Sequence, residues 1–212
     1  MSNKIILLFL LHVHLNGIIL GLSATDCGIA PKGSCAAPWK VSINANNAFC
    51  GGSLISDSWI VTMAHCVKDT PIDEINVNFP CGLGEYHVDR LELYPNSNPV
   101  RNINDIAVIR LEKNGPNEHM TPICLPPLKN QAEVVDLERI LQDLNTGLSD
   151  IESEYVAVQD SFSGTLISTF NGRQTLVGLM CWDTGSRYPR PTYMSLEEFI
   201  PWFNTVIAND KK

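Results

Sequence analysis

Between residues 39 and 112 the chain repeats one local pattern, a short stretch rich in Val, Ile, Trp or Phe that is bounded by Asn, Asp, Gly or Pro. β-Branched and aromatic residues favour strands, and the bounding residues favour turns. Many short strands at close spacing are typical of an all-β sandwich or barrel. The expected strands are residues 39–43, 49–55, 58–63, 74–79, 87–95 and 105–112.

The segment 130–158 differs from this pattern, because it is acidic, poor in aromatic residues and partly helical in its apolar period. A surface helix is expected there. The apolar residues that would share one face of that helix are Val134, Leu137, Ile140, Leu141 and Leu144.

The last quarter of the chain predicts a β-hairpin and a helix. Residues 165–170 and 174–182 have strand-like composition on either side of Asn171-Gly172, a dipeptide that favours a tight hairpin turn. The segment 195–210 opens with Ser195, which is a good helix cap. Pro201 interrupts that run, so the helix proper is expected to begin near it.

The first residues predict a targeting segment. Lys4 precedes an apolar run that ends in small residues, with Ala24 as the expected end of a removable signal peptide. A membrane anchor is the alternative, although His12, His14 and Asn16 interrupt the span. The formal net charge of −8, without a basic run, argues against nucleic-acid binding and favours solubility.

All seven cysteines lie beyond this segment, and in a secreted chain they are expected to form disulfides. The odd number leaves at least one cysteine free or paired with another chain. No CxxC pair and no metal-ligand spacing occurs, so neither a metal nor another cofactor is expected.

"FCGGSLISDSWIVTMAHCV" (49–67) holds His65 beside Cys66 at the end of an apolar run. A lone histidine in such a place is more often a hydrogen-bonded structural residue than a catalytic one. The segment nevertheless resembles the histidine motif of the chymotrypsin/trypsin-like (S1) serine protease family. That resemblance implies that His65 is a general base and that Cys50 and Cys66 form a disulfide.

Further along, "NDIAVIRLEK" resembles the family's strand whose aspartate orients the catalytic histidine, which here is Asp105. A buried carboxylate fixes the imidazole tautomer and stabilises the imidazolium formed in the reaction. "TPICLP" resembles the family's segment whose cysteine bonds back to the lead-in, which implies a Cys27–Cys124 disulfide. Cys35, Cys81 and Cys181 stay unassigned.

The resemblance also covers "LVGLMCW", similar to the substrate-binding strand with Trp182 at its aromatic position, and "FIPWFNTVI", similar to the closing helix. It implies two packed antiparallel β-barrels, the second reduced, and a C-terminal α-helix. The expected organisation is a signal peptide over residues 1–24, a lead-in segment over 25–38 and a trypsin-like peptidase domain over 39–212. The resemblance is weak between about Leu128 and Val158.

The nucleophile motif is altered. The family has Gly-Asp-Ser-Gly-Gly-Pro, whereas this chain has "QDSFSGTLI". Aligning Ser163 with the nucleophile keeps Gly164 after it but places Phe162 where the family has the preceding aspartate. Aligning Ser161 keeps Asp160 but places Phe162 at a glycine position. We prefer Ser163, and Ser161 is the alternative.

Two other family features are missing. No Ile-Val-Gly-Gly activation sequence occurs, and the basic bond in the lead-in, Lys32-Gly33, is followed by Ser-Cys. The position that holds an aspartate in trypsin-like specificity pockets is Ala157, or Tyr155 in the second alignment. Oxyanion-hole ordering and cleavage preference in the family depend on these features.

Three functions remain open. The first is a secreted serine protease homologue with lost or strongly reduced endopeptidase activity, which binds protein partners in an extracellular proteolytic cascade. The second is an active endopeptidase that uses His65, Asp105 and Ser163 (or Ser161) on peptide substrates. The third is an adhesive or structural module unrelated to proteolysis. The intact His65 and Asp105 favour the second, and the altered serine motif favours the first.

Overall fold

The computed structural model describes residues 27–46, 48–79, 84–98, 103–112, 120–126, 155–160, 163–183 and 190–210. Its first six strands are β1 (Lys40–Ala45), β2 (Ala48–Leu54), β3 (Trp59–Thr62), β4 (Ile75–Asn78), β5 (Glu85–Leu93) and β6 (Ala107–Leu111). They form a closed barrel in the order β1-β2-β3-β6-β5-β4, and each neighbouring pair is antiparallel. The six strands expected from composition are therefore confirmed.

The barrel is filled by apolar side chains, and in β1 and β4 the buried positions alternate with half-buried ones. In β1 the buried residues are Val41, Ile43 and Ala45, and their neighbours in sequence are half-buried. This period of two is what a strand with one face toward a core requires. Gly52 allows β2 to approach β3, because a Cβ at this position would lie 2.9 Å from the Val61 carbonyl oxygen.

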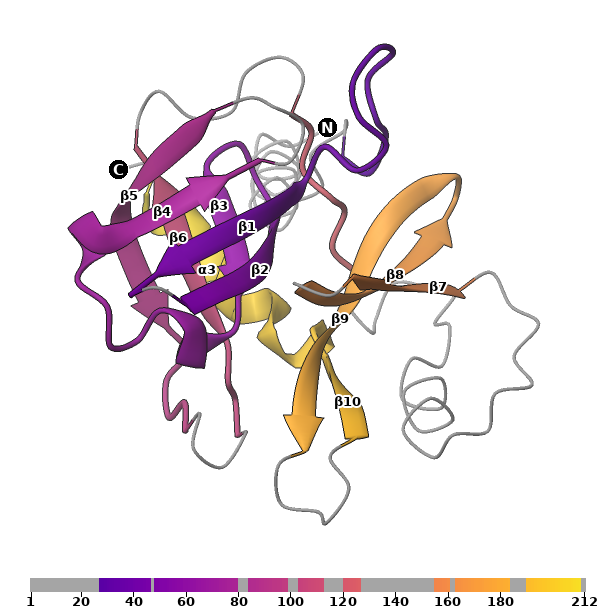
Figure 1. The fold of residues 1–212 in the computed structure, drawn as a ribbon. Coiled ribbons are helices and arrows are strands. Elements are labelled where there is room, and N and C mark those ends of the chain that lie inside the picture. The colour runs from indigo at the N-terminus through magenta and orange to yellow at the C-terminus, as the bar shows by residue number, and fades with distance from the viewer. Residues whose placement is uncertain are drawn as a thin grey trace, which may run out of the picture.

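A second sheet follows the barrel. Its strands are β7 (Tyr155–Asp160), β8 (Ser163–Phe170), β9 (Arg173–Asp183) and β10 (Arg190–Ser195), in the order β10-β9-β8-β7. Figure 1 shows β1–β6, in indigo to magenta, as one group and β7–β10, in orange to yellow, as another. The expected trypsin-like fold is confirmed, with the second barrel reduced to an open four-stranded sheet within the described residues.

The hairpin expected at Asn171-Gly172 joins β8 to β9. Both residues have positive φ, 51° and 75°, which a two-residue type I′ turn requires. The outer strands were not expected from sequence. β7 ends the acidic segment that was expected to be partly helical, and β10 contains Pro191, which edge strands tolerate.

The C-terminal helix α3 (Ile200–Asn209) begins next to Pro201, as expected, and packs Phe203, Val206 and Ile207 against the barrel core. Its end is tied to the barrel by Asp210. This carboxylate accepts a hydrogen bond of 3.2 Å from the Trp59 indole nitrogen and pairs with the Arg110 guanidinium. The helix therefore closes the fold over the first barrel.

The Cys27–Cys124 and Cys50–Cys66 disulfides are present, which confirms both expected pairings. The first joins the lead-in to a segment that also forms a parallel bridge to Thr175 of the second sheet. Cys35 is disulfide-bonded as well.

The expected signal peptide (1–24) and the expected helix spanning Val134 to Leu144 lie outside the described residues. Among the helices of the described part of the chain, none has the length and apolarity needed to cross a membrane.

Candidate active site

His65 is presented by a short turn at the end of a buried strand. The 3₁₀ helix η1 (Ala64–Cys66) follows β3, and both neighbours of His65 in this turn are buried. The His65 side chain is 53% exposed. The buried Ala64 and Cys66 thus fix the position of the partly exposed His65 ring at the end of an apolar run.

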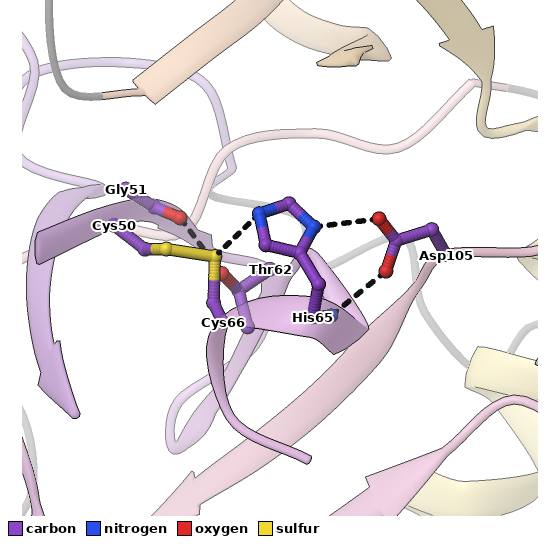
Figure 2. Close-up of a disulfide and its surroundings, with 6 residues drawn as sticks. All are labelled: Cys50, Gly51, Thr62, His65, Cys66 and Asp105. Carbon is purple, nitrogen blue, oxygen red and sulfur yellow. Dashed lines mark hydrogen bonds and ion pairs between the residues drawn. A yellow bond between two sulfur atoms is a disulfide. The ribbon is translucent and has the colours of Figure 1, made fainter. Parts of the chain in front are cut away.

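Asp105 holds this ring in place. Its side chain is only 1% exposed, and it lies directly before β6 beside Asn104, whose positive φ of 50° turns the chain there. Asp105 Oδ2 lies 2.6 Å from His65 Nδ1, and Oδ1 accepts the His65 backbone N–H at 2.8 Å (Figure 2). The expected proximity of the two residues is confirmed.

The electrostatics favour a charged ring. The hydrogen bond that the His65 ring donates to Asp105 is the main cause that raises the pKa of His65, and the negative charge of Asp105 adds to it. Partial burial and the positive charge of Lys68 act in the opposite direction. A neighbouring carboxylate that stabilises the imidazolium is what a histidine needs in order to accept a proton during a reaction.

The other ring nitrogen faces a disulfide. His65 Nε2 lies 3.5 Å from Cys66 Sγ, and Cys66 is bonded to Cys50 of β2 (Figure 2). Beside it, the Thr62 hydroxyl donates a hydrogen bond of 2.8 Å to the Gly51 carbonyl oxygen and connects β3 to β2.

Cys50, His65 and Cys66 offer three potential ligand atoms within 4.8 Å of one another. The two sulfur atoms are bonded to each other and are not thiolates, so the cluster does not provide the ligand set of a zinc site.

The described residues on either side of the altered nucleophile motif lie in two paired strands. Ser163 is the first residue of β8 and pairs with Asp160, the last residue of β7, so only two residues connect the strands. Gly164 follows, and a Cβ there would lie 2.1 Å from the Met180 Cβ. The Ser163 side chain and the whole of Ser161 lie outside the described residues, so the choice between the two serines stays a prediction.

Ala157 and Trp182 lie in β7 and β9, and Trp182 pairs with Pro191 of β10. The structure thus brings His65 and Asp105 together, and Ser163 is the first residue of β8. The contact between His65 and Cys66 was not expected, although their adjacency in sequence was the available signal.

The family model described as Trypsin matches residues 28–140, more than half of the 212-residue chain. This chain belongs to the trypsin family. The matched region contains His65 and Asp105 and ends before β7, so the segment with Ser161 and Ser163 lies beyond it.

The relatives include trypsins and larger serine proteases. Anionic trypsin of Canis lupus familiaris is 39% identical over 104 residues, 43% of this chain and 39% of that protein. Coagulation factor IX of Oryctolagus cuniculus is 36% identical over 107 residues, 42% of this chain and 36% of that protein. Hepatocyte growth factor activator serine protease of Mus musculus is 24% identical over 239 residues, 82% of this chain and 35% of that protein. This trypsin-family chain therefore spans little more than a third of the length of these relatives.

Proposed function

We propose that this trypsin-family protein has lost most or all endopeptidase activity and acts by binding protein partners in an extracellular proteolytic cascade. The observation that carries the proposal is the contrast between the two halves of the expected triad. The His65–Asp105 pair is intact, with 2.6 Å between ring nitrogen and carboxylate, whereas Ser163 flanks a two-residue β-hairpin.

The hairpin bears on the chemistry of acyl transfer. The family's nucleophile lies in a loop whose backbone N–H groups stabilise the oxyanion, and losing one such donor costs about 10²–10³ in rate. Asp160 and Ser163 are paired in the antiparallel β7–β8 ladder. The backbone beside the candidate nucleophile is therefore part of a sheet rather than of a loop that could form an oxyanion hole. The absence of an Ile-Val-Gly-Gly sequence supports the same conclusion, because the family orders its oxyanion hole with the terminus released there.

A serine protease fold with reduced endopeptidase activity can still bind other proteins. The disulfides and the relatives, which are trypsins and a coagulation factor, support an extracellular location. The predicted signal peptide over residues 1–24 agrees with it. The partners expected in that setting are active proteases or their substrates.

An active serine endopeptidase is the second candidate. The observation that favours it is the geometry of Asp105, which is buried and uses both carboxylate oxygens on His65. A carboxylate buried to this extent needs hydrogen-bond partners in any case, but an active endopeptidase needs those partners to be the ring and the backbone of the catalytic histidine.

A fluorophosphonate probe separates the two candidates, since it reacts only with an activated serine. Purified full-length protein is incubated with the probe and, separately, with a mixed peptide library. We expect neither labelling nor cleavage. Non-reducing peptide mapping that recovers Cys27–Cys124 and Cys50–Cys66 shows that the preparation is folded.

Variants show whether any labelling or cleavage comes from the expected catalytic residues. Labelling that is abolished by Ser163→Ala or Ser161→Ala, and also by His65→Ala, together with measurable cleavage, would refute the proposal and identify the nucleophile. Ser58→Ala, in the turn between β2 and β3, is the matched control and is expected to behave as the unaltered protein.

A further inference from the structure

The two sulfur atoms of the Cys50–Cys66 disulfide are not equivalent. Cys66 is 7% exposed and lies in the turn that carries His65, while Cys50 is half-buried on β2. His65 Nε2 lies 3.5 Å from Cys66 Sγ, as Figure 2 shows. Cys50 is therefore the cysteine more accessible to a reagent. Cys66 Sγ is the sulfur in contact with His65, whose ring can donate a proton.

We propose that the Cys50–Cys66 disulfide is a thiol–disulfide exchange site at which a low-molecular-weight thiol attacks Cys50 and His65 stabilises the departing Cys66 thiolate. The reagent's thiolate forms a bond to Cys50 Sγ, and the electron pair of the broken S–S bond leaves on Cys66 Sγ. The Nε2–H of the imidazolium then donates a hydrogen bond to this thiolate. A second molecule of thiol displaces Cys50 from the mixed disulfide and is oxidised with the first, while both cysteines are reduced.

Physical chemistry favours this direction of attack. Exchange is faster when the leaving thiol has a low pKa, and an adjacent imidazolium lowers a cysteine's pKa from about 8.5 to between roughly 3.5 and 7.5. In the oxidised protein the same imidazolium already faces the sulfur that must leave. No rearrangement is required before the bond breaks.

The surroundings of His65 favour its charged form. Asp105 accepts hydrogen bonds from both the ring and the backbone N–H of His65, and it raises the pKa of the ring. Lys68, on the same turn, lowers the pKa of His65 but forms an ion pair of 2.7 Å with Asp69. These are the charged groups that act on the ring within the described residues.

The Cys27–Cys124 disulfide provides an internal comparison. Both of its cysteines are buried, and backbone groups surround them. The Gly28 N–H donates to the Pro122 carbonyl oxygen at 2.8 Å, and the Cys124 N–H donates to the Gln174 carbonyl oxygen at 3.1 Å. This bridge has the same bond chemistry without the histidine contact.

The test is partial reduction of the full-length oxidised protein with reduced glutathione. Samples are quenched by alkylation, and mass spectrometry follows the opening of each disulfide with time. We expect Cys50–Cys66 to open at least about tenfold faster than Cys27–Cys124, because of the lowered pKa of the leaving thiol. His65→Gln is expected to slow the opening of Cys50–Cys66 by about tenfold and to leave Cys27–Cys124 unchanged. Lys68→Gln, which removes a neighbouring charge but keeps the ring, is the matched control and should stay within about twofold of the unaltered protein.

A pH profile of the unaltered protein tests the same step without a variant. The rate constant per glutathione thiolate is expected to fall as pH rises through the pKa of His65, because the imidazolium is lost. In His65→Gln the constant should not change over that range. A pH-independent constant in the unaltered protein, an equal rate for the two disulfides, or a His65→Gln rate equal to that of the unaltered protein would each overturn the proposal.

Discussion

The two described disulfides close loops of very different size, and their removal should therefore destabilise the protein to different extents. We compare the double variant Cys27→Ala/Cys124→Ala with Cys50→Ala/Cys66→Ala, each with all other cysteines retained. The first bridge spans 97 residues of chain and the second spans 16. Alanine is used rather than serine, because a serine hydroxyl could be left buried without a hydrogen-bond partner.

The expected difference follows from the entropy of the unfolded chain. A cross-link that closes 97 residues removes about 4.7 kcal/mol of unfolded-state freedom, and one that closes 16 residues removes about 3 kcal/mol. The shorter bridge and the disulfide of Cys35 reduce the effective length of the longer loop, which lowers the first value by about 0.5 kcal/mol. Cys27 and Cys124 are both buried, whereas Cys50 is half-buried, so the loss of packing acts in the same direction.

Urea denaturation under non-reducing conditions measures the free energy of unfolding of each variant. We expect the Cys27/Cys124 variant to lose about 1 kcal/mol more than the Cys50/Cys66 variant. The slopes of the transitions must agree within error for the comparison to hold. A Cys50/Cys66 variant that is equally or more destabilised would refute the loop-entropy reasoning.

Three further predictions concern the site and the lead-in. Asp105→Asn should lower the pKa of His65, because it removes the charge that stabilises the imidazolium; NMR titration of the ring measures this, and an unchanged pKa would contradict the assignment. Because the folded-state pKa of His65 lies above its unfolded value of 6.5, the stability that this ring contributes should be complete below pH 6.5 and be lost as pH rises through the folded pKa. Thermal unfolding as a function of pH should show this trend, which should be absent in His65→Gln. Gly28→Ala should cost about 2–4 kcal/mol, because φ is +70° and the new Cβ would lie 2.3 Å from the Gln174 carbonyl oxygen. The control Gly33→Ala, with φ +88° and no atom within 4 Å, should cost only about 1 kcal/mol, and equal losses in urea denaturation would contradict the steric argument.

Local sequence was sufficient for much of the secondary structure. Short runs of β-branched and aromatic residues bounded by turn-forming residues predicted the strands of the barrel, because these residue types favour strands and turns wherever they lie in a fold. Asn171-Gly172 predicted the β8–β9 hairpin, since few other dipeptides accept positive φ at both positions. β7 escaped detection because its short apolar alternation ends a segment whose period is helical.

The His65–Asp105 pair could be expected only because two motifs resembled one family, since no local pattern relates the turn after β3 to a residue just before β6. The antiparallel pairing of those strands is what brings the pair to 2.6 Å. The sequence by itself thus determined the family, the barrel strands and the identities of the candidate site residues. Tertiary structure alone decided that His65 Nε2 meets Cys66 Sγ and that Ser163 flanks a two-residue hairpin. Ring orientation and strand register depend on contacts between distant parts of the chain, which spacing along the sequence does not encode.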